Sequence, residues 1–206
     1  MLLEILVEEL SAEEAMRALL PRLVGPGVTF EVHSFQGKRD LLAKLAERLR
    51  GYARWMASGV ETRVVILIDE DRQDCRVLKA QLDRAAADAG LRAKSVAGPG
   101  EPFVVLNRLA VEELEAWFFG DCSAVRAAYP GVPPTLEAKA RFRHADAIAG
   151  GTWEQLEKVL QGAGHHRGGL AKVQAARDIA RHMDPSRNTS PSFACFVAGV
   201  RALVAA

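Results

Sequence analysis

The sequence lacks an excess of either charge, and its few cysteines form no motif. Its 206 residues include 27 Lys and Arg against 26 Asp and Glu, which gives a formal net charge of +1. Nucleic-acid binding therefore has to rest on local basic patches and not on total charge. The three cysteines, Cys75, Cys122 and Cys195, form neither a CxxC pair nor a cluster with zinc-site spacing. We expect reduced thiols in a cytoplasmic protein.

Long hydrophobic runs are also missing. No apolar stretch approaches the roughly 18 residues of a membrane span, so we expect no membrane partner. The apolar start MLLEILVEEL carries three glutamates and no basic segment, which favours a β-strand over a signal peptide. Apolar residues nevertheless make up 49% of the chain, which is enough for a substantial core.

The first half of the chain alternates short apolar runs with amphipathic segments. The pattern predicts helices at 11–23, 39–56 and 74–89, and strands at 2–7, 28–34, 62–68, 91–97 and 103–109. Ser11 and Glu14 have the spacing of a capping box for the first helix. The run TRVVILI at 62–68 is apolar on both faces, which is typical of a central strand in a parallel sheet. The expected fold class is therefore α/β, with a mostly parallel, Rossmann-like sheet flanked by helices.

The pattern changes near residue 110. Strand signals stop there, and the remaining segments predict helices separated by loops. We therefore divide the chain into an α/β domain at 1–110 and a helical extension at 111–206 that packs against it.

Acidic residues follow two of the predicted strands at the point where each strand ends. Glu8 and Glu9 follow the first strand, and Asp69 and Asp71 follow the third. Because ligands of open parallel sheets bind at the carboxyl ends of the strands, these acids are expected to converge. Clustered carboxylates need a cation or raised pKa values, and hard oxygen ligands suit Mg²⁺ or Mn²⁺. The sequence predicts a divalent metal site here, with helix capping as the alternative role of such acids.

A second acidic block, VEELEAWFFGD at 111–121, follows the last predicted strand. On a helix, Glu112 and Glu115 would share a face. Glu115 then becomes a candidate ligand for a second metal. The alternative is a helix whose first-turn acids favour its dipole and whose aromatic residues enter the core.

The strand-end acids resemble the pattern of the TOPRIM family of topoisomerases, primases and OLD-type nucleases. The resemblance rests on Val7-Glu8 after the first strand, Gly37 after the second, and the DxD of Asp69 to Asp71 after the third. More narrowly, five blocks in order are similar to an uncharacterised bacterial TOPRIM-like family whose genes tend to lie beside ATPase genes in mobile or defence settings. These blocks are LVEELSAEE, FQGKRDLLAKL, LIDEDRQDC, VEELEAWFFGD and NTSPSFACF.

The resemblance implies roles for these residues. Glu8 would transfer a proton, and Asp69 and Asp71 would bind the metal. TOPRIM domains usually have Gly where this chain has Glu9, so Glu8 and Glu9 could exchange roles. The acid that holds a second metal in OLD-type nucleases has no counterpart at its usual spacing, which leaves Glu13 as a substitute.

Basic residues supply candidate phosphate contacts. Lys38 follows Gly37 at a predicted helix start, where free backbone N–H groups favour anions. Arg167 lies in the loop sequence HHRGG, and Lys172 follows it. We expect these three residues to contact phosphate, and the other cations of the helix at 39–56 to form a solvated face.

Together these features predict a metal-dependent nuclease that cleaves nucleic acid, DNA rather than RNA, with an ATPase as a partner protein. The metals would neutralise the scissile phosphate and activate water. Two alternatives stay open: a regulatory TOPRIM-like protein without catalysis, and a receiver-like domain that accepts phosphate on Asp69. A receiver domain, however, needs a Lys after its fifth strand, and Asn107 and Arg108 stand at that position.

Overall fold

Four parallel strands form the central sheet of the computed structural model, which describes residues 1–71 and 73–205. The strands are β1 (Leu2–Val7), β2 (Thr29–Ser34), β3 (Thr62–Asp69) and β4 (Val105–Ala110). Their order is β2-β1-β3-β4, and every pairing is parallel. The predicted α/β class with helices on both faces is confirmed, and the doubly apolar β3 lies inside the sheet.

The predicted strand at 91–97 is wrong. Among the described residues of this segment only Ala93 forms a bridge, to Val105 of β4. The chain then turns, because the backbone N–H of Val96 donates to the Ala93 carbonyl oxygen. Leu91 and Ala93 are buried, whereas Val96 is 66% exposed, so a longer strand would bury little further apolar surface.

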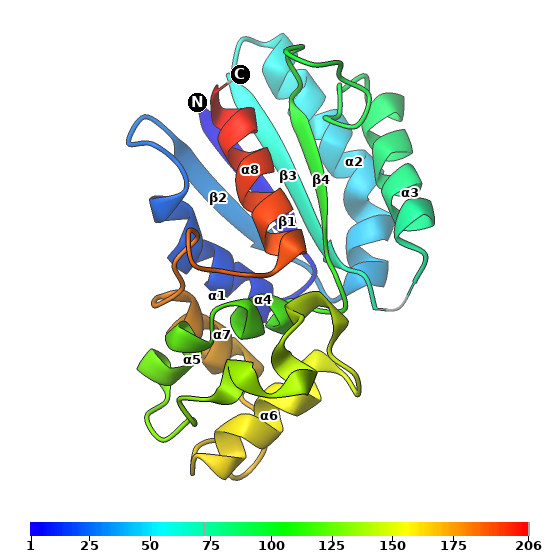
Figure 1. Ribbon diagram of the computed structural model, residues 1–206. Coiled ribbons are helices and arrows are strands. Elements are labelled where there is room, and N and C mark those ends of the chain that lie inside the picture. Colours follow the sequence, from blue (N-terminus) through cyan, green and yellow to red (C-terminus); the bar gives the residue numbers. More distant parts are fainter. Residues whose placement is uncertain (72, 206) are drawn as a thin grey trace.

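Helices cover both faces of the sheet (Figure 1). Helices α2 (Lys38–Ala57) and α3 (Cys75–Asp88) cover the face that carries Leu6 and Ile66. Helices α1 (Leu10–Leu19) and α8 (Pro191–Ala205) cover the opposite face, which carries Ile5 and Val65. Alternate residues of one strand thus enter different cores, as the two-residue period of a strand requires.

The last helix therefore belongs to the layer that covers the sheet, although it comes from the extension. Gly199 of α8 lies so close to β4 that a Cβ atom there would be 2.8 Å from a methyl carbon of Leu106. Residues of both predicted parts share one core. The boundary near residue 110 stays a prediction, and the extension does pack against the α/β part.

The remaining helices lie beyond the carboxyl ends of the strands, in the lower part of Figure 1. They are α4 (Glu115–Gly120), α5 (Cys122–Ala128), α6 (Thr152–Gly162) and α7 (Lys172–Ala180). Short 3₁₀ turns are formed by Leu20–Arg22, Leu136–Ala138, Ala140–Phe142 and Ala145–Ala147. None of the helices in the described parts of the chain is long and apolar enough to cross a bilayer.

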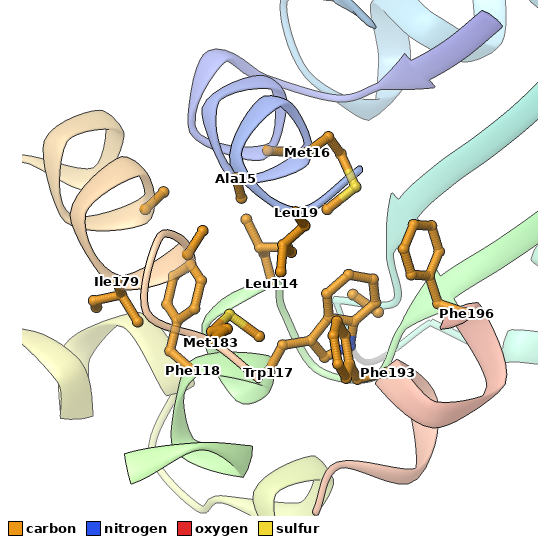
Figure 2. Close-up of a cluster of buried hydrophobic side chains, with 14 of the residues drawn as sticks. Ala15, Met16, Leu19, Leu114, Trp117, Phe118, Ile179, Met183, Phe193 and Phe196 are labelled. Carbon is orange, nitrogen blue, oxygen red and sulfur yellow. The ribbon is translucent and has the colours of Figure 1, made fainter. Parts of the chain in front are cut away.

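Helix α4 is held by a cluster of aromatic residues (Figure 2). Trp117 is fully buried, and its ring centroid lies 5.1 Å from those of Phe193 and Phe196 in α8. Its indole N–H donates to the Ser192 hydroxyl oxygen at 2.8 Å, which satisfies the one polar atom of the side chain. Figure 2 also shows Leu114 pointing toward Leu19 of α1. The start of α4 is thus fixed relative to the sheet.

The predicted capping box of the first helix is wrong. Helix α1 begins at Leu10, one residue before the predicted start, and Glu9 occupies the N-cap position without a side-chain hydrogen bond to the helix. Ser11 is buried in the first turn, and its hydroxyl donates to Glu9 Oε1 at 2.6 Å. Ser11 therefore cannot serve as the cap.

Candidate functional site

Three strand ends meet at the carboxyl edge of the sheet, and each contributes acids. β1 leads into Glu8, β3 ends on Asp69, and β4 leads into the segment 111–115. The backbone N–H of Asp71 donates to the Glu112 carbonyl oxygen at 3.0 Å, which ties the second loop to the third. Both residues have positive φ angles, 51° and 62°. The predicted helix at Glu112 is therefore wrong, because this φ lies outside the helical region.

Glu8 points toward the end of β3. Its Oε1 atom accepts the backbone N–H of Asp69 at 2.8 Å, and the side chain is almost wholly buried. Burial raises the pKa of Glu8 to about 7, although this hydrogen bond and the charge of Lys38 oppose the rise. Glu8 is therefore held next to Asp69 and can exchange a proton near neutral pH.

Glu115 is the acid with the strongest charge effect on Asp69. Burial raises the pKa of Asp69 well above its ordinary value, and the charges of Glu115, Glu8 and Asp71 raise it further, in that order. Glu115 itself is only 3% exposed, and burial raises its pKa to about 7. The structure thus brings the predicted Glu115 close enough to Asp69 for its charge to raise the pKa of Asp69.

Lys38 lies among these acids. It is the first residue of α2 and follows Gly37, whose φ of 89° allows the backbone N–H to reach the Glu8 carbonyl oxygen at 2.8 Å. The Lys38 ammonium is 2.9 Å from Asp71 Oδ2 and 4.0 Å from Glu8 Oε1. It also donates to the Glu70 carbonyl oxygen at 3.3 Å. Lys38 therefore acts as the internal counter-ion of the cluster.

Glu9 and Glu13 are oriented differently. The carboxylate of Glu9 accepts the Ser11 hydroxyl, and its charge raises the pKa values of Asp69 and Glu115 only as a minor contribution. Glu13 forms an ion pair with Arg17 at 2.9 Å and accepts the Ser34 hydroxyl. The structure therefore does not bring Glu13 to the group around Asp69.

The two predicted cations of the extension differ in position. Lys172, the first residue of α7, lies over the Trp153 ring at 4.8 Å, and its charge lowers the pKa of Glu115. It is therefore close enough to influence the site. Arg167 is exposed on a loop and has no ion pair within the described parts of the chain.

The sequence did not assign roles to Glu113 and Glu154. Glu113 Oε2 accepts the backbone N–H groups of Thr152 and Trp153, both at 3.0 Å, and so caps α6. A cavity of about 220 Å³ lies beside it, lined by Asp71, Glu112, Glu113, Gly151 and Glu154. The acidic block at 111–115 was the available signal for Glu113. Glu154 gave none, because its proximity depends on how α6 docks.

The carboxylates of this site have the chemistry that a hard cation prefers, but their present arrangement does not form a metal site. Carboxylate oxygens are the ligands that Mg²⁺ and Mn²⁺ prefer, and burial raises the pKa values of Asp69, Glu8 and Glu115. In residues 1–71 and 73–205, however, no three His, Cys, Asp or Glu side chains are arranged to hold a metal ion. Glu8 is bonded to the Asp69 N–H and Asp71 to Lys38. Metal binding would require Asp71 to leave Lys38.

The fold and site define a parallel α/β protein with a buried acidic cluster at the carboxyl edge of its sheet. A family model, the domain of unknown function DUF4276, matches residues 7–201. The chain belongs to this family. No curated protein and no solved structure matches the chain.

Proposed function

We propose that the protein is a metal-dependent phosphodiesterase that cleaves nucleic acid, with Mg²⁺ or Mn²⁺ held by Asp69, Asp71 and Glu8. The observation that carries the proposal is the convergence of Asp69, Glu8 and Glu115 at the carboxyl edge of the sheet, where burial raises all three pKa values and the charges of Glu115 and Glu8 raise that of Asp69 further. Acids kept together at such a cost in stability are typical of functional sites.

The residues divide into three roles. Asp69, Asp71 and Glu8 would hold the cation, with Glu115 as a further oxygen ligand. The cation would supply charge neutralisation at the scissile phosphate and a more acidic bound water. Glu8, with a pKa of about 7, is suited to accept or return a proton at neutral pH. Lys38, released from Asp71, would bind a phosphate oxygen as a point charge.

Lys172 supports this assignment because it lies at the start of α7, where its charge lowers the pKa of Glu115. A phosphate group bound near Glu115 would therefore meet a second cation besides Lys38. Arg167 lies a few residues before Lys172 on an exposed loop and would add a further positive charge.

The TOPRIM relationship is part of the same proposal. The acids after β1 and β3 follow the TOPRIM order, and the resemblance implies DNA as substrate and an ATPase as partner in a defence or mobile-element system. Glu9 at the usual Gly position and the orientation of Glu13 toward Arg17 distinguish this chain from that pattern. A single metal with Glu115 nearby therefore fits better than a pair that uses Glu13.

The first experiment measures metal binding without activity. Isothermal titration of Mn²⁺ into the wild type should show one site, and Asp69→Asn should weaken it at least tenfold. Asp88→Asn is the matched control, because Asp88 is an exposed acid at the end of α3. Equal Mn²⁺ affinity in the wild type and Asp69→Asn would sink the metal site.

The second experiment measures cleavage. Plasmid DNA and single-stranded RNA are incubated with wild type, Asp69→Asn, Glu8→Gln and Asp88→Asn in Mg²⁺, Mn²⁺ or EDTA. We expect cleavage of DNA that needs the metal and falls at least a hundredfold in the first two variants. Cleavage that persists in EDTA or in Asp69→Asn contradicts the proposed mechanism.

A further inference from the structure

A second polar pocket lies between β1, β2 and α2, away from the acidic site. Its volume is about 500 Å³, within the range of small-molecule sites. Its walls include Glu4, His33, Arg48, Gly51, Tyr52 and Trp55. Glu4 precedes Glu8 by four residues of extended chain, so their Cα atoms are about 13 Å apart.

Glu4 forms the floor of this pocket and is only 3% exposed. Its Oε2 atom accepts the Tyr52 hydroxyl at 2.9 Å and lies 2.6 Å from His33 Nε2. Its Oε1 atom forms no hydrogen bond with any residue that the structure describes. Within the described residues it is also not among the fully enclosed polar atoms that lack a partner, so this oxygen is accessible from the pocket. The pocket therefore offers an acceptor that a ligand's N–H groups can satisfy.

The wall opposite the sheet is the face of α2 that carries Arg48, Gly51, Tyr52 and Trp55. The indole of Trp55 is 47% exposed, which is unusual for so large an aromatic side chain. It stands edge-on to Tyr52, with ring centroids 5.6 Å apart, so one face can take a stacked ring. The pocket thus combines a stacking surface with a buried acceptor.

Gly51 keeps the pocket open. It lies in the middle of a 20-residue helix, where glycine costs about 1 kcal/mol relative to alanine. Its φ angle is not positive, and a Cβ atom there would meet no atom within 4 Å. Neither backbone conformation nor packing therefore requires glycine, but any larger side chain would enter the pocket.

The mouth is basic. Arg48 and Arg54 line it and form no ion pair in residues 1–71 and 73–205. Lys44 is paired with Asp40 at 2.6 Å, and Glu47 is the acid of the rim. Two arginines free of acidic partners suit a phosphate group at the entrance.

We propose that the pocket between β2 and α2 binds a guanine nucleotide, with the base on Trp55, its N–H edge on Glu4, and the phosphate at Arg48 and Arg54. Guanine is the base whose N1–H and N2–H₂ donors lie side by side, so both can be directed at Oε1 of Glu4, the oxygen that His33 and Tyr52 leave open. Adenine and cytosine place an acceptor beside their amino group, which would face the Glu4 oxygen unfavourably. This site does not depend on the metal-dependent activity proposed above.

Trp55 fluorescence and isothermal titration test the proposal with GMP, AMP and inorganic phosphate as probes. GMP should bind at least tenfold more tightly than AMP, and phosphate alone should bind more weakly still. Two pentanucleotides, d(TTGTT) and d(TTATT), distinguish the source of the guanine. Tighter binding of d(TTGTT) than of both d(TTATT) and GMP indicates a guanine within a strand. Tighter binding of GMP than of d(TTGTT) indicates a free nucleotide. Equal affinity for GMP, AMP and phosphate, or no binding of any probe at about 1 mM, overturns the proposal.

Two variants locate the binding. Glu4→Gln should lower GMP affinity at least tenfold, since an amide presents a donor as well as an acceptor. Gly51→Leu should abolish binding while the thermal midpoint stays equal or rises, and Ala43→Leu, on an exposed part of α2 outside the pocket, should leave binding unchanged. If Glu4→Gln unfolds, Gly51→Leu still decides. Wild-type affinity in Gly51→Leu refutes the site, whereas Asp69→Asn should bind GMP normally.

Discussion

Replacing Glu115 by Gln should remove part of the dependence of the protein's stability on pH. In the unfolded chain the carboxyl ionises near its ordinary pKa of 4.5, whereas burial in the folded state raises that pKa to about 7. Between these values the unfolded state binds fewer protons, so the free energy of unfolding falls as pH rises. The difference of about 2.5 between the two values corresponds to an upper limit of about 3 kcal/mol.

Glutamine keeps the shape of the protonated acid and cannot ionise. Glu115→Gln should therefore exceed the unfolding free energy of the wild type by less than about 1 kcal/mol at pH 5 and by about 2–3 kcal/mol at pH 8. Urea denaturation at pH 5, 6, 7 and 8 in EDTA measures the difference, with Glu31→Gln, an exposed acid of β2, as control. The reasoning about Glu115 is refuted if the difference between variant and wild type does not grow with pH.

Other predictions concern packing. Gly199→Ala should destabilise the protein by about 1–3 kcal/mol, because its Cβ would overlap Leu106, whereas Gly51→Ala should stabilise it by up to about 1 kcal/mol; thermal unfolding of both shows whether the signs differ. Phe196→Ala should cost about 3–5 kcal/mol in urea, since the ring is fully buried against Trp117, and a cost below about 1 kcal/mol would contradict the shared core. Asp74→Ala should cost about 1 kcal/mol, because Asp74 caps α3 through the N–H of Arg76, with the exposed Asp88→Ala expected to cost less.

Local sequence patterns predicted most of the sheet. The segments that became β1, β2, β3 and β4 each carry an apolar or alternating pattern within a few neighbouring residues, and their propensity does not depend on which element packs against them. The segment 91–97 has a similar pattern but forms only the Ala93 bridge, because the neighbouring chain turns and Val96 stays exposed. Whether this segment forms a strand therefore depended on which elements pack against it.

The same distinction applies to the acidic site. Glu8 and Asp69 were predicted together because both follow parallel strands, whose carboxyl ends share one edge of a sheet. Glu13 was named as a substitute for the acid that is missing at the usual spacing, but helix α1 turns its carboxylate toward Arg17 and Ser34. An orientation on a helix depends on where the helix begins, and the start at Leu10 was not predicted.

The sequence by itself therefore determined which acids stand at the ends of strands, and that these acids repel one another without a cation. Only the tertiary structure decided how close Glu115 comes to Asp69, because the two residues are 46 positions apart and the packing of Trp117 against α8 sets the start of α4. The tertiary structure also decided that Glu4 of β1 contacts His33 of β2 and Tyr52 of α2 in one pocket. Periodicity is a property of neighbouring residues in the sequence, whereas burial and charge contacts arise only when separate elements pack against one another.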